Sequence, residues 1–290
     1  MKPIAISIIG LPFLLLITGC AINPETGQNQ WIVLSEAREI KLGEQASPKF
    51  IESYGGQVPS PELSEYVHKI GVKLARKSKR PLLPWKFYVV DSAVINAFAL
   101  PGGKVFLSRG LLAKLDNEAQ LAGIIGHEIG HVTAKHVNDQ MAGRLALRGI
   151  LAGLGTATRN SNDQWLQVLG TGTRVGGTVF LLHYTRQQEY EADVLGVRYM
   201  AELGYNPMGQ VQVMQILKAE RASAQVGPQL LATHPLPQQR ISRLRQHIGQ
   251  RYTDHKSNDF YRFDRDHFHA NVKQRLAALP PPKHQEKSEP

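Results

Sequence analysis

The stretch His127-Glu128-Ile129-Gly130-His131 decides the fold, because it is a complete HExxH motif of the kind found in zinc peptidases. If the stretch is helical, the two imidazoles project from one face, one turn apart, and both reach a single metal ion. Glu128 then lies beside the metal rather than on it. From there its carboxylate can take a proton from water and later pass it to a leaving amine. The motif therefore predicts a metal-dependent hydrolytic site.

The residues before the motif predict the helix that it needs. Asn117 with Gln120 has the pattern of an N-cap followed by a capping box. Helical spacing then continues through the motif, at Leu121, Ile124, Ile125, Glu128 and Val132. The alternative is a pair of histidines in a surface helix that binds no metal. The helical context favours the metal.

A third ligand is expected about sixty residues on, in the segment 186–193. Glu189 and Asp193 are four residues apart and share a helix face, whereas Glu191 points elsewhere. Glu189 can complete a site of two histidines and one glutamate, and Asp193 can orient a ligating imidazole through its other nitrogen. The alternative is a solvated acidic helix face, with Arg186 paired to Tyr190 or Glu189.

A second arrangement of zinc ligands, HExxHxxGxxH, does not match. It requires glycine at 134 and histidine at 137, where the chain has Ala134 and Val137. His136 is one residue out of register. We expect it to be a polar residue on the same helix rather than a ligand.

Together these motifs resemble those of the gluzincin family of HtpX-like and CAAX-prenyl-protease-like membrane-associated metallopeptidases. The resemblance rests on HEIGH, on EYEAD at 189–193, on the stretch 96–110 and on Thr233-His234-Pro235. It covers residues 35–250 and is closest to a periplasmic lipoprotein branch. It implies an α+β, mainly α, zincin-like fold, with an active-site helix, a second ligand helix and a small sheet edging the cleft.

The resemblance also implies roles for residues. His127, His131 and Glu189 would bind one zinc ion per chain, and Glu128 would be the general base. His234 would lie near the zinc, where it either donates to the oxyanion or occupies the open coordination position and keeps the enzyme latent. As an alternative, His234 only caps a turn. Tyr184, Arg186 and Tyr190 are the rival oxyanion donors.

The first twenty residues predict a membrane anchor. Residues 4–17 form the apolar core of a signal peptide covering residues 1–19, and Ile17-Thr18-Gly19-Cys20 resembles a bacterial lipobox. Cys20 is the only cysteine and would be lipidated, which gives stable anchoring. The residue after Cys20, at the position that directs lipoprotein sorting, is Ala21 and not Asp. By resemblance to other lipoproteins, we therefore expect the protein in the outer membrane, facing the periplasm.

No later segment is long enough to span a bilayer, because the apolar runs 149–157 and 175–182 are too short. We expect Leu145–Leu182 to form buried or hairpin helices, or else a mobile flap over the cleft. The net charge of +10 favours an anionic membrane surface or acidic substrates over nucleic acid, for which no binding module is present. The basic residues between 240 and 275 are expected on a solvated helix face.

The remaining patterns give the domain organisation. We expect a lipidated tether at 20–33, a zinc metallopeptidase domain at 34–252 and a basic C-terminal extension at 253–290, whose Pro-rich tail from Ala277 does not pack. Within the domain, helices are predicted at 34–54, 61–77, from 206 and at 235–248, a strand at 85–91 and a hairpin at 96–107. The segment 98–107 is either an edge for extended substrate or an ordinary core hairpin.

The sequence thus predicts a zinc-dependent metalloendopeptidase that removes misfolded or misassembled proteins of the cell envelope. The alternative is an envelope-protein assembly factor or holdase that rarely cleaves, and the intact Glu128 argues against it. Expected partners are unfolded or misassembled envelope proteins and the membrane, through the lipid anchor. No pattern indicates an oligomeric state.

Overall fold

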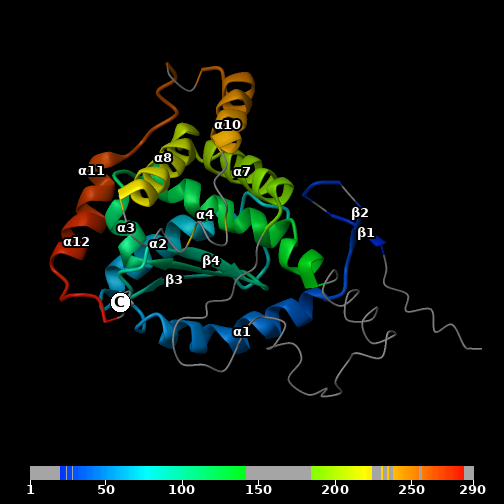
Figure 1. Ribbon diagram of the computed structural model, residues 1–290, viewed down its shortest axis with the longest axis horizontal. Helices are drawn as coiled ribbons and strands as arrows, with labels where there is room; N and C mark the ends of the chain where they lie inside the picture. The colour runs from blue at the N-terminus through cyan, green and yellow to red at the C-terminus, as the bar shows by residue number, and fades with distance from the viewer. Residues whose placement is uncertain are drawn as a thin grey trace, which may run out of the picture.

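A computed structural model describes residues 20–141, 184–223, 230, 234, 238–254 and 257–283, apart from residues 24 and 28. A small sheet lies between helix α1 (Glu36–Ser53) on one side and helices α2 (Pro61–Ala75) and α4 (Glu118–Thr133) on the other (Figure 1). Helices α7 (Arg186–Ala201) and α8 (Met208–Ser223) cover α4, and α10 (Gln238–Arg251) lies outermost. This arrangement confirms the predicted mainly helical α+β fold.

The sheet has three strands, β3 (Lys86–Val90), β4 (Ala97–Leu100) and β5 (Lys104–Ser108), in the order β3-β5-β4. β4 and β5 form the predicted antiparallel hairpin, with Phe98 opposite Phe106, and β3 runs parallel to β5. The hairpin turn contains Gly102 and Gly103, both at positive φ, which only glycine adopts freely. Because β5 lies in the middle, only β4 of the predicted segment 98–107 stands at an edge.

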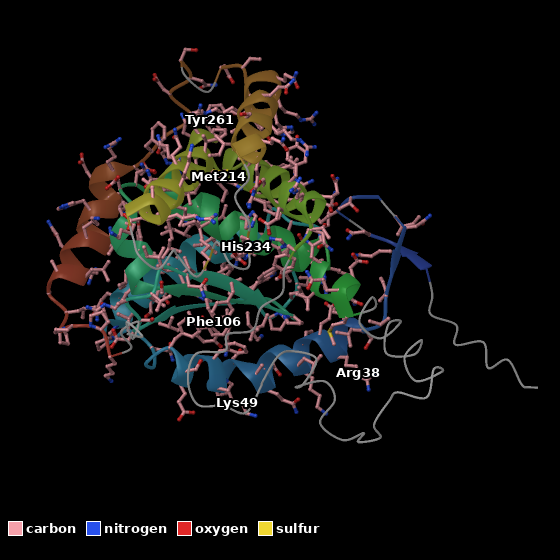
Figure 2. All side chains as sticks on the ribbon, viewed as in Figure 1. Arg38, Lys49, Phe106, Met214, His234 and Tyr261 are labelled. Carbon is pink, nitrogen blue, oxygen red and sulfur yellow. The ribbon has the colours of Figure 1, made fainter. Side chains whose placement is uncertain are left out.

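Both faces of the sheet are buried, and alternate residues of each strand enter different clusters. Phe98, Leu100 and Phe106 pack with Phe50 of α1, and the rings of Phe98 and Phe106 stack 4.8 Å apart. Figure 2 shows Phe106 between the sheet and α1. The intervening residues face α2 and α4 in the main cluster: Ala97, Ala99, Val105 and Leu107. The short helix α3 (Arg109–Lys114) follows β5.

Helix α4 carries HExxH and is buried along its whole length. Its N-cap is as predicted, since the side chain of Asn117 accepts a hydrogen bond from the backbone N–H of Gln120. The expected capping box is not closed: the Gln120 side chain accepts from the backbone N–H of Asp116, one residue earlier. The helix start is therefore fixed by the predicted cap.

The C-terminal extension is more ordered than predicted. Helix α11 (Arg265–Phe268), the π-helical turn η1 (His269–Lys273) and helix α12 (Gln274–Ala277) bring the fully buried Phe268 and Val272 into the main cluster. The carbonyl of Pro280 accepts a hydrogen bond from Arg109. After Ala277 the chain therefore still contacts the domain at Leu279 and Pro280, whereas Ala277, Ala278 and Lys283 are exposed.

The predicted tether at 20–33 also has structure. Strands β1 (Cys20–Ile22) and β2 (Asn29–Trp31) form a hairpin. Between them, Asn23 donates to the carbonyl of Ala134 at 2.6 Å, and Glu25 pairs with Arg198 at 2.5 Å. These contacts dock the hairpin on α7 and on the end of α4.

Two predictions fall outside the described residues: the signal peptide at 1–19 and the segment Leu145–Leu182. Among the helices of the described residues, none combines the length and the apolar character needed to cross a membrane.

Candidate metal centre

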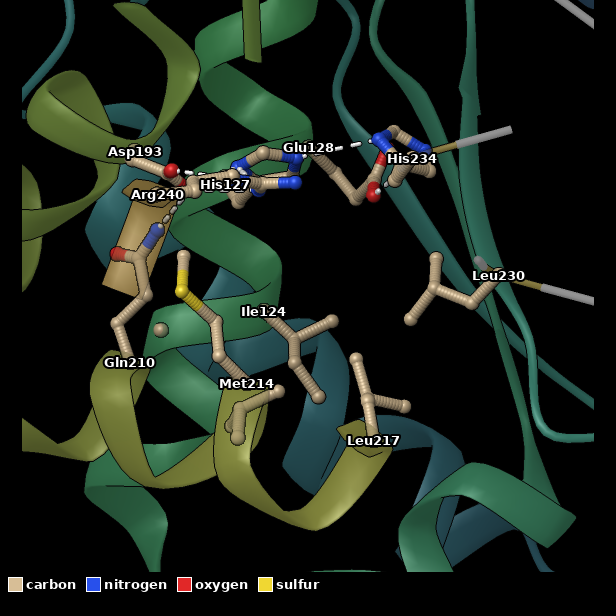
Figure 3. Close-up of a pocket in the computed structure, with 12 residues that line it drawn as sticks. Ile124, His127, Glu128, Asp193, Gln210, Met214, Leu217, Leu230, His234 and Arg240 are labelled. Carbon is tan, nitrogen blue, oxygen red and sulfur yellow. Dashed lines mark hydrogen bonds and ion pairs between the residues drawn. The ribbon is translucent and has the colours of Figure 1, made fainter. Parts of the chain in front are cut away.

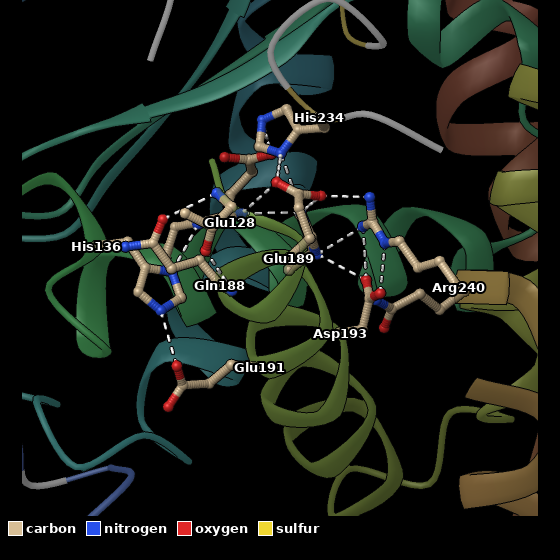
Figure 4. A network of polar contacts seen from close by, with 12 residues as sticks. Glu128, His136, Gln188, Glu189, Glu191, Asp193, His234 and Arg240 are labelled. Carbon is tan, nitrogen blue, oxygen red and sulfur yellow. Dashed lines mark hydrogen bonds and ion pairs between the residues drawn. The ribbon is translucent and has the colours of Figure 1, made fainter. Parts of the chain in front are cut away.

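Four buried side chains from three parts of the chain converge on one point. His127 and His131 come from α4, Glu189 from α7, and His234 from the region before α10. One potential ligand atom from each lies within 4.8 Å of the others. Nε2 of His127 is 3.0 Å from Nε2 of His131 and 3.2 Å from Nδ1 of His234. The structure thus brings together the three predicted ligands and His234, and Figure 4 shows the side chains of Glu189 and His234 meeting at this point.

The donor set fits zinc, which takes imidazole nitrogen and carboxylate oxygen in tetrahedral sites. Oε1 of Glu189 lies 3.4 Å from Nε2 of His131 and 2.8 Å from Nδ1 of His234. Among the described residues, neither carboxylate oxygen of the fully buried Glu128 has a hydrogen-bond partner. Such an orphaned carboxylate is costly unless water or a metal-linked ligand satisfies it, so it supports a water molecule at the metal.

The electrostatics favour the protonation states that metal ligands need. Burial holds the pKa of His131 well below its usual value, so its imidazole is neutral. Burial alone would raise the pKa of Glu189, but His234 and Arg240 hold it well below its ordinary value, so the group is ionised. Burial raises the pKa of Glu128, which suits a group that both accepts and returns a proton.

Asp193 lies where the sequence predicted, behind a ligand. Its Oδ1 accepts a hydrogen bond from Nδ1 of His127 at 2.9 Å, which leaves Nε2 of that ring free for a metal. Arg240 donates to Asp193 at 2.6 and 2.8 Å and also pairs with Glu189. Arg240 is buried in the centre and not on a solvated face as predicted. In the sequence, Arg240 looks like the other basic residues between 240 and 275, so its burial could not be predicted.

His136 and Glu191 form a second support that the sequence did not reveal. The chain turns after α4, with Lys135 at φ 55°, so His136 does not continue the same helix as predicted. Its Nδ1 lies 2.8 Å from Nδ1 of His131, and its Nε2 lies 3.1 Å from a carboxylate oxygen of Glu191. If Nε2 of His131 binds the metal, its Nδ1–H donates to His136, which in turn donates to Glu191.

Of the rival oxyanion donors, Tyr184 lies at the centre. Its ring stacks on His131 with 3.8 Å between centroids, and burial raises its pKa well above the usual value, so it keeps its proton. Arg186 is exposed, and the guanidinium of Arg243 covers the ring of Tyr190. The structure thus brings Tyr184, and neither of the other two, into the site.

A pocket opens beside the centre, between α4 and α8 (Figure 3). His127, Glu128 and His234 line its polar end. The remaining wall is largely apolar and includes Ile124, Val213, Met214, Leu217 and Leu230. The site therefore combines a potential metal centre, a buried carboxylate without a hydrogen bond among the described residues, and an apolar cavity.

Comparison with known proteins identifies similar chains. The model of peptidase family M48 matches residues 61–248, well over half of the chain, including all four converging residues. The beta-barrel assembly-enhancing protease of Escherichia coli (strain K12) is 29% identical over 250 residues, covering 82% of this chain and 50% of that protein. Mitochondrial metalloendopeptidase OMA1 of Schizosaccharomyces pombe is 27% identical over 227 residues, covering 77% and 65%.

A further relative is the putative beta-barrel assembly-enhancing protease of Vibrio cholerae, 29% identical over 231 residues, covering 78% of this chain and 47% of that protein. The chain thus spans about half the length of these bacterial relatives.

Proposed function

This chain belongs to peptidase family M48, whose members are zinc metallopeptidases, and we propose that it is a zinc-dependent metalloendopeptidase that acts at its buried centre. The observation that carries the proposal is the position of Glu128. Its carboxylate is buried, has no hydrogen-bond partner among the described residues and lies beside the converging His127, His131 and Glu189. Its charged neighbour is His234, whose Nε2 lies 3.7 Å from Oε1 of Glu128. A site that only bound metal would not need this buried acid.

Each residue has a role in this mechanism. His127, His131 and Glu189 hold one zinc ion per chain, with Asp193 fixing the ring of His127. Zinc bound there supplies a Lewis acid for the scissile carbonyl and lowers the pKa of water. Glu128 takes the proton from the attacking water and delivers it to the leaving amine. The phenol of Tyr184, which stacks on His131, is placed to donate to the oxyanion.

His234 has two possible roles at this site. Its Nδ1 lies within hydrogen-bond distance of both Glu189 and His127. A nitrogen in this position competes for the open coordination position that water or substrate needs. The arrangement therefore supports a latent state, in which His234 must move before cleavage and can then act as an oxyanion donor. On this proposal, His234→Ala removes the block.

We also propose where the enzyme works and on what. The chain would be a lipoprotein held by Cys20 in the outer membrane, facing the periplasm, where it cleaves misfolded or misassembled envelope proteins. The bacterial relatives, named as beta-barrel assembly-enhancing proteases, support an envelope role. The same name supports the second candidate function, an assembly factor that rarely cleaves.

The deciding experiment is Glu128→Gln. The amide keeps the size of the side chain and leaves the metal ligands intact, but it removes the basicity. Cleavage of unfolded casein should fall by about 10²–10⁴-fold, whereas zinc content and melting temperature should barely change. Because the wild type is expected to be latent, Glu128→Gln is compared in the His234→Ala background, with wild type assayed in parallel.

An assembly factor would give the opposite pattern. It would show no chelator-sensitive cleavage in wild type or in His234→Ala, and Glu128→Gln would still support envelope assembly in cells. If neither protein cleaves any unfolded substrate with zinc bound, the peptidase proposal is wrong.

A further inference from the structure

The pocket beside the metal centre has two chemically different ends. One end is polar and holds His127, Glu128 and His234. From there the cavity continues along α4 past Ile124 to the facing side of α8, at Val213, Met214 and Leu217. It contains about 410 Å³ not occupied by atoms, part of it open to solvent.

The apolar end has no charged group on its wall. Figure 3 shows Ile124, Met214, Leu217 and Leu230 around the open space, with the acidic and basic groups gathered at the opposite end. A charged side chain placed among these residues would lose its hydration without gaining a partner. An aliphatic side chain would be stabilised there, because its apolar surface is removed from water. The walls therefore select for apolar groups.

Leu230 shows that an aliphatic side chain fits against this space. Its backbone N–H donates to the carbonyl of Ile95 at 3.3 Å, just before the edge strand β4. Its side chain, which is only 6% exposed, lines the pocket. Leu230 belongs to a helical turn, since its carbonyl accepts from the N–H of His234 at 2.8 Å, and it turns a leucine side chain toward the cavity.

A substrate in extended conformation can pair with the edge strand β4 while one of its side chains enters the cavity. Peptides that add to a sheet edge gain affinity from main-chain hydrogen bonds and specificity from pockets for alternate side chains. Because this pocket begins at Glu128, the side chain that it holds must belong to a residue next to the bond that is cut. Leu230 would have to leave the pocket mouth for this to happen.

We propose that this pocket is the side-chain specificity subsite of the enzyme and that it selects a leucine- or methionine-sized aliphatic residue flanking the scissile bond. This inference rests on the proposed peptidase function. The residues that set the specificity are Ile124, Val213, Met214 and Leu217. Charged side chains are rejected at this position, and alanine fills too little of the cavity.

The first test changes the size of the pocket in the full chain. Val213→Phe narrows it and Leu217→Ala enlarges it, while Ile216→Phe on the same helix is the control, because Ile216 is half-buried and does not line the pocket. Each change is made in wild type and in His234→Ala. Cleavage sites in unfolded proteins are mapped by mass spectrometry, and zinc content and melting temperature are measured for each variant.

Leucine and methionine should be enriched on one side of the cut. Val213→Phe should shift the preference to alanine and glycine and lower kcat/KM for a leucine peptide by roughly 10–100-fold. Leu217→Ala should shift the preference to phenylalanine, and Ile216→Phe should leave it unchanged. A cleavage profile without aliphatic enrichment, or one that neither pocket variant alters, would overturn the proposal.

The second test needs no turnover. Two amino-acid hydroxamates that differ only in a leucine or an alanine side chain are titrated into zinc-loaded Glu128→Gln,His234→Ala protein by calorimetry. The leucine compound should bind about 10–100-fold more tightly, and Val213→Phe should abolish the difference. Equal binding would contradict the pocket assignment. Selective binding here, together with no cleavage by either wild type or His234→Ala, would refute the peptidase function and leave the apolar subsite in place.

Discussion

Glu189 and Glu191 lie two residues apart on α7, yet only Glu189 reaches the ligand histidines. Its Oε1 is 3.4 Å from Nε2 of His131, the nitrogen that faces the other candidate ligands. Glu191 contacts His136 instead, at 3.1 Å, and His136 contacts the opposite nitrogen of His131. On our proposal Glu191 would therefore influence a bound metal only through two imidazoles, whereas Glu189 would bind it directly.

This difference predicts different results for two similar variants. Glu189→Ala should remove zinc, because one of the ligands is lost. Glu191→Ala should keep about one zinc per chain, with an affinity roughly 10-fold lower because the ring of His131 is less well oriented. Metal analysis gives the stoichiometry, and competition with a chelator gives the affinity.

Glu202→Ala is the matched control, since that acid is exposed just after the same helix. Full zinc in Glu189→Ala would show that our ligand assignment is wrong. Loss of zinc in Glu191→Ala would show that the ligand lies on the other face of α7, at Glu191.

At the scale of elements, the metal centre depends on how closely α4 and α7 approach. The helices cross through glycines, and a Cβ added to Gly126 would lie 3.0 Å from the Cα of Gly196. A Cβ added to Gly196 would lie 2.8 Å from the backbone nitrogen of His127. These contacts are with backbone atoms that cannot move aside. Glycine at these positions therefore sets the distance between His127 and Glu189.

Gly196→Ala should accordingly weaken both the fold and the metal site. We expect a loss of about 1–3 kcal/mol in the free energy of unfolding, typical of overpacking, together with lower zinc affinity. Gly249→Ala on α10 is the control, because an added Cβ there meets no atom within 4 Å. It should raise stability by about 0.5–1 kcal/mol. Denaturant unfolding measures both, and equal behaviour of the two variants would contradict the close-packing argument.

Elements determined by neighbouring residues could be predicted from the sequence. The cap at Asn117, strand β3 and the β4–β5 hairpin depend on local patterns, and each was found where expected. The end of α4 could not be predicted, because no glycine marks it. Side chains from distant parts of the sequence satisfy the carbonyls there: Arg80 donates to Val132, and Asn23 donates to Ala134.

Some residues of the candidate metal site could likewise be predicted from the sequence, and others could not. HExxH and the spacing of Glu189 and Asp193 are local patterns that place side chains on one helix face. The parts that were missed, Arg240 and the pair His136–Glu191, depend on how α10, α7 and the turn after α4 pack together. Arg240 is one arginine among several in α10, and packing alone brings it to Asp193.

At the scale of the whole molecule, both ends of the described chain pack against the rest of the domain. Glu25 in the N-terminal hairpin accepts from Arg198 and from the hydroxyl of Tyr199, both on α7. At the other end, Phe268 is fully buried in the main cluster. The β1–β2 hairpin begins at Cys20 itself. If Cys20 carries the lipid, the peptidase domain therefore sits close to the membrane surface, without a long flexible linker.

Cys20→Ala tests this anchoring. Lipobox processing requires the thiol, and the chain has no other cysteine to supply it. The variant should therefore accumulate as an uncleaved precursor that incorporates no labelled palmitate, whereas the wild type should stay in the membrane fraction after a high-salt wash. Ala21→Asp is the matched control, because it keeps the thiol: it should still be acylated, and it should move to the inner membrane. A wild-type protein that lacks palmitate and is released by mild salt would show that the basic surface, and not a lipid, holds this enzyme at the membrane.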